Sequence, residues 1–195
     1  MLFQNLGARL AEVRDRVAAA VARGGHGQRV TLIAVTKTHG PEAVRAAWEA
    51  GVLNVGENKV QEALAKMAAV DVPVRWHLIG HLQRNKVRDL DHFALVHSID
   101  RASIADAVSA FGIARKRSVD ALVQVNVAGE ETKGGFAPAD MPAEAERFVM
   151  RAGLRITGVM TMAPLNANER VTRHVFEGAR IARDLLVSAG HPAFD

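Results

Sequence analysis

The chain alternates between amphipathic segments and short apolar runs. Residues 2–23 place apolar side chains three or four positions apart, which predicts one amphipathic helix. Its apolar stripe is formed by Leu6, Leu10, Val13, Val17 and Val21. Residues 31–36, TLIAVT, are β-branched and apolar, as is typical of a buried strand. Pro41 and Gly51 then bracket a short helix over 41–50.

The same alternation continues to the end of the chain. Further strands are predicted at 52–56, 74–80, 94–99, 120–127 and 155–160. Helices are predicted over 57–69, 83–90, 101–116, 140–152 and 168–189. Strands that alternate with helices indicate a parallel sheet, which is either doubly wound or closed into a (β/α)8 barrel.

The ends of the predicted strands favour the barrel. Five strands end in polar or glycine residues, and parallel α/β folds place their sites at these carboxyl ends. These ends are Thr36-Lys37, Gly56-Glu57-Asn58, Gly80-His81, Ser98-Asp100 and Asn126. A barrel gathers all of them around one mouth, although six strands do not close an eight-stranded barrel.

Composition narrows the class of protein. With 195 residues the chain is predicted to form a single domain over 1–195. No apolar run approaches the roughly 18–20 residues of a membrane span, and the N-terminus does not resemble a signal peptide. The absence of Cys excludes disulfides, thiolate metal sites and a cysteine nucleophile. We therefore expect a cytoplasmic protein with no membrane partner.

The basic charge raises the alternative of a nucleic-acid partner. Lys and Arg number 25 against 21 Asp and Glu, which gives a net charge of +4. The basic residues are interspersed with acids, and the basic segment 81–92 carries no interleaved aromatic residues for base stacking. A solvated surface is therefore favoured, and no nucleic-acid partner is expected.

Lys37 is the strongest candidate for chemistry. It directly follows an apolar strand, so its amine is expected at the barrel mouth and partly desolvated, with a lowered pKa. A neutral amine attacks aldehydes, which suits Schiff-base formation. The alternatives are a solvated lysine or one paired with Glu57. His77 and His81 could be read as a metal pair, but no accompanying carboxylate or thiolate pattern supports zinc, and no metal is expected.

Five motifs in order resemble the pyridoxal-5′-phosphate (PLP) homeostasis protein family: LIAVTKTHGPEAVRAAWEAGVLNVGENKVQEA, RWHLIGHLQRNKV, HSID, VQVNVAGEETKGGF and ITGVMTMAP. The resemblance implies the barrel of the alanine racemase N-terminal domain and a Schiff base between PLP and Lys37. It also implies that Asn58 lies near the cofactor ring, and that His81, Asn126 and Met160 line the same mouth. The implied role is in intracellular vitamin B6 and amino-acid homeostasis. Apo PLP-dependent enzymes would be the partners of a monomer or weak dimer.

The chain departs from the family pattern at its C-terminal end. Family members continue with a Ser-Met-Gly-Met-Ser type strand and an Arg-Ile-Gly type segment, which complete the barrel and hold the cofactor phosphate. The last two strands are therefore expected to be missing from these 195 residues. Charge-assisted hydrogen bonds to phosphate contribute strongly, so we expect this chain to hold PLP weakly or only through Lys37.

The residue content favours a carrier over a catalyst, so no catalytic residue is assigned. PLP racemases of this fold pair the lysine with a tyrosine, and this chain contains no Tyr and no Cys. A single lysine cannot easily serve both faces of a substrate carbanion. The alternative is a racemase-like PLP enzyme acting on amino acids, in which His81 would be the second acid or base.

Overall fold

The computed structural model describes residues 3–130 and 132–191, and these form two compact units. The first unit runs to His77 and the second begins at Leu78, so the boundary falls within one strand. The end of the chain at Asp195 and position 131, within the Gly-rich loop after the fifth strand, lie outside the described residues.

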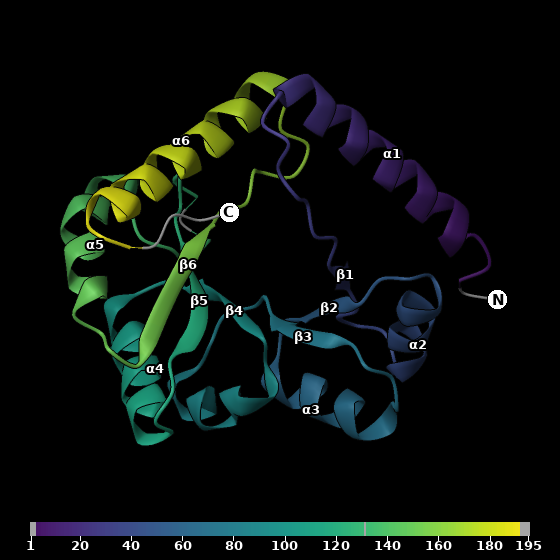
Figure 1. Cartoon of the computed structure of the whole chain (residues 1–195), viewed down its shortest axis with the longest axis horizontal. Coiled ribbons are helices and arrows are strands. Elements are labelled where there is room, and N and C mark those ends of the chain that lie inside the picture. Colours follow the sequence, from purple (N-terminus) through teal and green to yellow (C-terminus); the bar gives the residue numbers. More distant parts are fainter. Residues whose placement is uncertain (1–2, 131, 192–195) are drawn as a thin grey trace. The chain divides into compact units, whose positions relative to one another are not determined.

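The first unit alternates helices and short strands (Figure 1). Its elements are α1 (Leu6–Gly24), β1 (Ala34–Val35), α2 (Pro41–Glu49), β2 (Asn54–Glu57), α3 (Val60–Ala69) and β3 (Arg75–Leu78). The strands lie in the order β1-β2-β3. β1 pairs with β2 in parallel, with Ala34 opposite Val55 and Val35 opposite Gly56.

The second unit has longer strands. Its elements are η1 (Arg84–His92), β4 (Leu95–Ile99), α4 (Ala102–Ala114), β5 (Val119–Gln124), η2 (Pro138–Asp140), α5 (Met141–Val149), β6 (Leu154–Met160) and α6 (Glu169–Ser188). The parallel order is β4-β5-β6, with α4 and α5 along one side of these strands (Figure 1).

The pattern of apolar positions predicted these elements closely, with two corrections. Residues 31–36 were expected to form a buried strand, but only Ala34 and Val35 pair as β1, and Val35 is exposed. The helix expected over 83–90 is the 3-10 helix η1. Apolar β-branched residues favour a strand only where a neighbour offers hydrogen bonds, and the register that begins at Ala34 leaves 31–33 outside the ladder.

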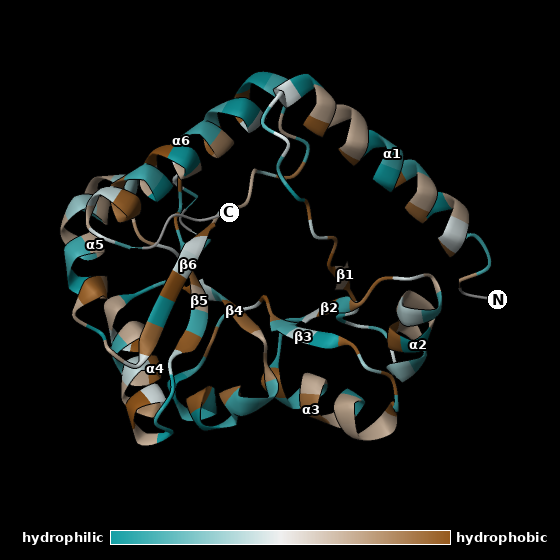
Figure 2. Cartoon of the chain, viewed as in Figure 1, coloured by the Kyte–Doolittle hydropathy of each residue, from teal (hydrophilic) through white to brown (hydrophobic). Residues whose placement is uncertain are grey.

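Helix α1 is amphipathic but contributes no fully buried side chain. Its polar and apolar residues alternate around the helix (Figure 2). The apolar stripe is half-buried at Leu6, Leu10, Val17 and Val21 and exposed at Val13. The helix is tied to the rest of the first unit by Arg14, whose Nη2 donates to the Gly51 carbonyl at 3.1 Å.

In the second unit, α4 packs closely on the turn before β6. A Cβ added to Gly112 would lie 2.0 Å from the Gly153 carbonyl oxygen, so only glycine allows this approach. The core around it contains Ile104, Val108, Ala121, Phe148 and Ile156, all buried. No helix in the described part of the chain is both long and apolar enough to cross a membrane.

Candidate functional site

In the first unit, two predicted site residues follow two neighbouring parallel strands. Lys37 lies two residues beyond β1, and Asn58 lies one residue beyond β2. The Thr36 N–H donates to the Gly56 carbonyl at 3.1 Å, which extends the β1–β2 register past the end of β1. Lys37 and Asn58 therefore follow the ends of two paired strands.

The side chains at these two strand ends differ in burial. Thr36 and Glu57 are buried, whereas Lys37 is exposed and Asn58 is half-buried. Glu57 and Asn58 are successive residues at the end of β2, where side chains alternate between the two faces. The expected partial desolvation of Lys37 is therefore wrong for this structure, since its position just outside β1 leaves the side chain in solvent.

The buried face carries an ion pair that the sequence did not reveal. Lys66 Nζ, from α3, lies 2.6 Å from Glu57 Oε1 and donates to the Thr36 carbonyl at 2.7 Å. The Thr36 hydroxyl donates to the same Glu57 oxygen at 2.5 Å. We call Thr36, Glu57 and Lys66 the buried network. The alternative that Glu57 pairs with Lys37 is therefore wrong, because this carboxylate is fully buried and paired with Lys66, whereas Lys37 is exposed.

A sequence signal for Lys66 does exist. The buried positions of α3 are Val60, Ala63 and Lys66, which are three residues apart. A lysine that continues the apolar stripe of a helix is expected to be buried. Since a charged side chain is almost never fully buried unless it is paired, this position predicts an ion pair.

His77 lies on β3, and its Nε2 lies 3.0 Å from Asn54 Oδ1. Burial, and secondarily the charge of Arg75, lowers the pKa of His77 from its ordinary value of 6.5. His77 Nε2 therefore already has a hydrogen-bond partner, the side-chain amide oxygen of Asn54. Among residues 3–130 and 132–191, no three His, Asp or Glu side chains gather as metal ligands would.

In the second unit, His81 belongs to a charged cluster at the end of β4. His81 Nδ1 lies 2.7 Å from Asp100 Oδ2, and Arg101 Nη1 lies 2.6 Å from Asp100 Oδ1. The Asp100 side chain is only 4% exposed, whereas His81 is 60% exposed. We call His81, Asp100 and Arg101 the rim cluster. It presents a solvent-accessible imidazole whose orientation is fixed by a buried carboxylate, an arrangement suited to moving protons.

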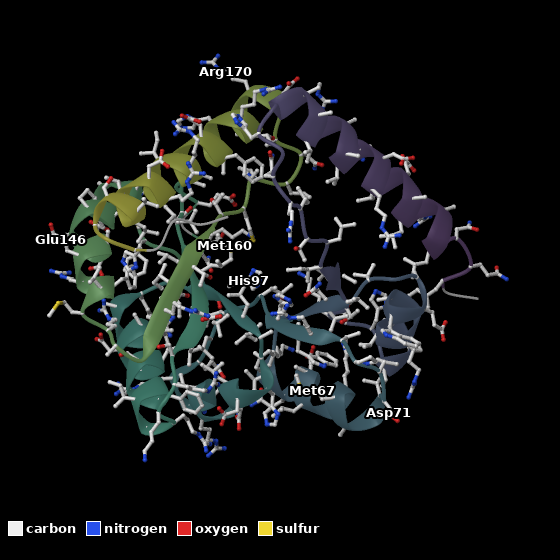
Figure 3. The ribbon with its side chains drawn as sticks, viewed as in Figure 1. Met67, Asp71, His97, Glu146, Met160 and Arg170 are labelled. Carbon is white, nitrogen blue, oxygen red and sulfur yellow. The ribbon has the colours of Figure 1, made fainter. Side chains whose placement is uncertain are left out.

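Asn126 and Met160 follow β5 and end β6. The Asn126 amide Nδ2 donates to the carbonyls of Glu130 and Lys133, at 2.9 and 3.2 Å, so it anchors the loop after β5. Met160 is half-buried at the carboxyl end of β6 (Figure 3), and its carbonyl accepts from the Val125 N–H at 2.9 Å. All five predicted residues thus lie at carboxyl ends of strands, two in the first unit and three in the second.

The chain is similar to proteins of one family along almost its whole length. Residues 9–193 match the family model of the alanine racemase N-terminal domain. The chain is 42% identical to the pyridoxal phosphate homeostasis protein of Pseudomonas aeruginosa over 175 residues, which are 89% of this chain and 74% of that protein. It is 37% identical to the protein of the same name from Aquifex aeolicus over 181 residues, which are 91% and 79% of the two chains.

Solved structures agree in fold. The structure of PipY from Synechococcus elongatus with PLP bound superposes with a TM-score of 0.79 at 31% identity, covering 96% of this chain and 85% of that one. Alanine racemase from Corynebacterium glutamicum gives a TM-score of 0.68 at 12% identity, covering 84% and 47% of the two chains, which is a likeness of fold alone. The expected barrel type, that of the alanine racemase N-terminal domain, is confirmed, with six of its strands in the described residues. The chain belongs to the pyridoxal phosphate homeostasis protein family.

Proposed function

We propose that this chain is a PLP-binding protein of vitamin B6 and amino-acid homeostasis that holds PLP as a Schiff base on Lys37. The observation that carries the proposal is the exposed side chain of Lys37, which, like Asn58, follows the carboxyl end of one of two paired parallel strands. The names of the relatives and the PLP-bound structure of PipY support the choice of ligand.

The residues present in the first unit fit such a ligand. The Lys37 amine and the aldehyde of PLP would form a C=N bond and release one water, with no other reactant needed. Asn58, at the end of the neighbouring strand, offers an amide that can donate and accept hydrogen bonds. We also assign His81, Asn126 and Met160 to the cofactor-binding residues, on their places at the ends of their strands.

A carrier role is favoured over catalysis. Bound PLP would supply an aldehyde carbon that exchanges between amines. Racemisation in addition needs acid and base groups on both faces of the substrate. His81, which is hydrogen-bonded to Asp100 in the rim cluster, is our candidate for the second such group beside Lys37. A PLP-dependent enzyme acting on amino acids is therefore the second candidate function, and apo PLP-dependent enzymes remain the partners that a carrier would serve.

The test is chemical trapping. The protein is incubated with PLP, reduced with borohydride and digested, and the pyridoxyl adduct is located by mass spectrometry. An adduct confined to Lys37 and lost in Lys37→Ala is expected, whereas adducts scattered over exposed lysines such as Lys59 would refute the assignment. Exchange of the α-proton of free amino acids in deuterated water, dependent on His81, would instead favour the enzyme.

A further inference from the structure

Thr36, the residue before Lys37, is held at every polar atom of its backbone and side chain. Its N–H donates to the Gly56 carbonyl, and its hydroxyl donates to Glu57 Oε1. Its own carbonyl accepts from Lys66 Nζ at 2.7 Å and from the His39 N–H at 3.2 Å. Two of these four contacts come from the charged members of the buried network.

The bond from His39 closes a turn that contains Lys37. Thr36 and His39 are its ends, and Lys37 and Thr38 are its two central residues. Thr38 has a φ of 67°, and Lys37 is not among the described residues with positive φ. A positive φ at the third position alone is the requirement of a type II turn, which Gly or Asn usually meets.

Thr38 is an unfavourable residue at this position. A β-branched side chain with positive φ is an outlier, because Cβ and its substituents crowd the backbone. Such a conformation persists only when the surrounding contacts over-determine it. Two hydrogen bonds fix the Thr36 carbonyl, with which the turn begins, and the His39 ring also contacts Phe3.

Stability alone does not account for the buried network. A buried ion pair is often no more stabilising than apolar side chains of the same volume, because both charges lose their hydration. Lys66 continues the buried positions of α3 after Val60 and Ala63, where an apolar side chain is the ordinary choice. What an apolar residue could not supply is a charged donor aimed at the Thr36 carbonyl.

We infer that Lys66 and Glu57 are positioning residues for Lys37: the buried network clamps the strained turn 36–39 and thereby fixes the direction in which the Lys37 amine leaves the strand. The inference deepens the proposed function and rests on it. Neither residue is assigned a contact with the cofactor, since both side chains are buried and act through the hydroxyl and the carbonyl of Thr36.

The test combines removal of the clamp with relief of the strain. Lys66→Met is expected to weaken PLP binding at Lys37 by about ten-fold, because the turn relaxes and the amine loses its direction. Adding Thr38→Gly to Lys66→Met is expected to restore most of this loss, because glycine adopts the positive φ without a clamp. Binding is measured by titration with PLP and by the yield of the borohydride-reduced Lys37 adduct.

A matched control separates positioning from general destabilisation. Val44→Ala opens a cavity in α2, where Val44 is fully buried, without touching the turn. It is expected to lower stability and leave PLP affinity unchanged when equal amounts of folded protein are compared. Equal losses of affinity in Val44→Ala and Lys66→Met, or no restoration by Thr38→Gly, would overturn the inference.

A milder pair of variants covers the case in which Lys66→Met does not fold. Thr36→Val removes only the hydroxyl that donates to Glu57, and Thr36→Ser keeps it. Weaker binding in Thr36→Val with retained binding in Thr36→Ser is expected, and equal affinities of the two would overturn the inference. A wild-type adduct at Lys37 that no variant weakens refutes the clamp alone, whereas a wild-type protein without that adduct refutes the Schiff-base proposal and the clamp together.

Discussion

The two units place clusters of polar and ionisable side chains at the ends of their strands in opposite ways. In the first unit the buried network seals Glu57 completely and leaves Lys66 only 8% exposed, under strands of two to four residues. In the second unit the rim cluster buries only the carboxylate of Asp100 and leaves His81 and Arg101 open to solvent, after strands of five to seven residues.

This difference relates to how each unit is held together. The short strands of the first unit offer few ladder hydrogen bonds, and side-chain contacts hold the end of β1 in place. The longer ladder between β5 and β6 pairs six positions, and close packing at Gly112 adds to it. The second unit therefore fixes its strand ends through the backbone and leaves its charged side chains accessible. Buried charged side chains are suited to holding the backbone in position, and solvent-exposed ones are suited to contact with a ligand.

The sharpest test of this contrast is the ion pair of the buried network. We expect Lys66→Met to lower the free energy of unfolding by about 3–5 kcal/mol, because it leaves the Glu57 carboxylate buried without its cation. Lys59→Met is the matched control, since Lys59 is the N-cap residue of the same helix and pairs with Glu62 at 2.7 Å on the surface. Denaturant unfolding of both variants measures the difference, and similar effects in the two would show that burial of the pair does not matter.

Close packing in the second unit gives the next largest effect. Gly112→Ala is expected to cost about 1–3 kcal/mol, because the added methyl group meets the Gly153 carbonyl and α4 must shift. Gly7→Ala is the control in the first unit, where a Cβ would meet no atom within 4 Å. Thermal unfolding should show a loss for Gly112→Ala and none for Gly7→Ala. Unchanged stability in Gly112→Ala would contradict the close approach of α4 to the turn before β6.

The rim cluster should tolerate the loss of a partner better than the buried network does. Asp100→Asn is expected to cost about 1–2 kcal/mol, because His81 and Arg101 can turn to water once their carboxylate is gone. Chemical unfolding of Asp100→Asn and Lys66→Met compares the two losses in the free energy of unfolding. A larger loss in Asp100→Asn would show that solvent exposure does not determine how strongly each cluster stabilises the fold.

The smallest effect concerns pH and His77. Because burial lowers the pKa of folded His77 below 6.5, the unfolded chain takes up a proton first as pH falls. The contribution of His77 is therefore complete above pH 6.5 and is lost as pH falls from there through the folded pKa. His77→Gln keeps a partner for Asn54 and removes the titration. Its stability should fall less steeply than that of the wild type below pH 6.5, in unfolding curves taken at several pH values.

Sequence patterns predicted the elements well because burial imposes a period on them. The helix predicted over 41–50 is α2, and the strand predicted at 155–160 lies within β6. The same patterns placed Lys37 and Asn58 at strand ends, which the structure confirms. Their role in binding PLP stays a prediction.

The side-chain contacts that could not be predicted from the sequence depend on the register of the strands. Whether Glu57 meets Lys37 or Lys66 is decided by which face of β2 turns toward α3, and one residue of shift would exchange the two faces. The positive φ of Thr38 was also unforeseen, since threonine is a poor candidate for that conformation. The pairing of Asp100 with His81 joins residues 19 positions apart and needs the fold as well.

The turn at Thr38 also affects which substitutions selection for stability would favour. Glycine at this position would remove backbone strain at once, so a search for heat-resistant variants should find it early. If the clamp directs Lys37, such variants would no longer need Lys66 to direct the amine, and Lys66 would be kept only for its ion pair with Glu57. A gain in stability at one exposed threonine would then remove one of two constraints on a buried lysine, and Lys66 would be expected to change only together with Glu57.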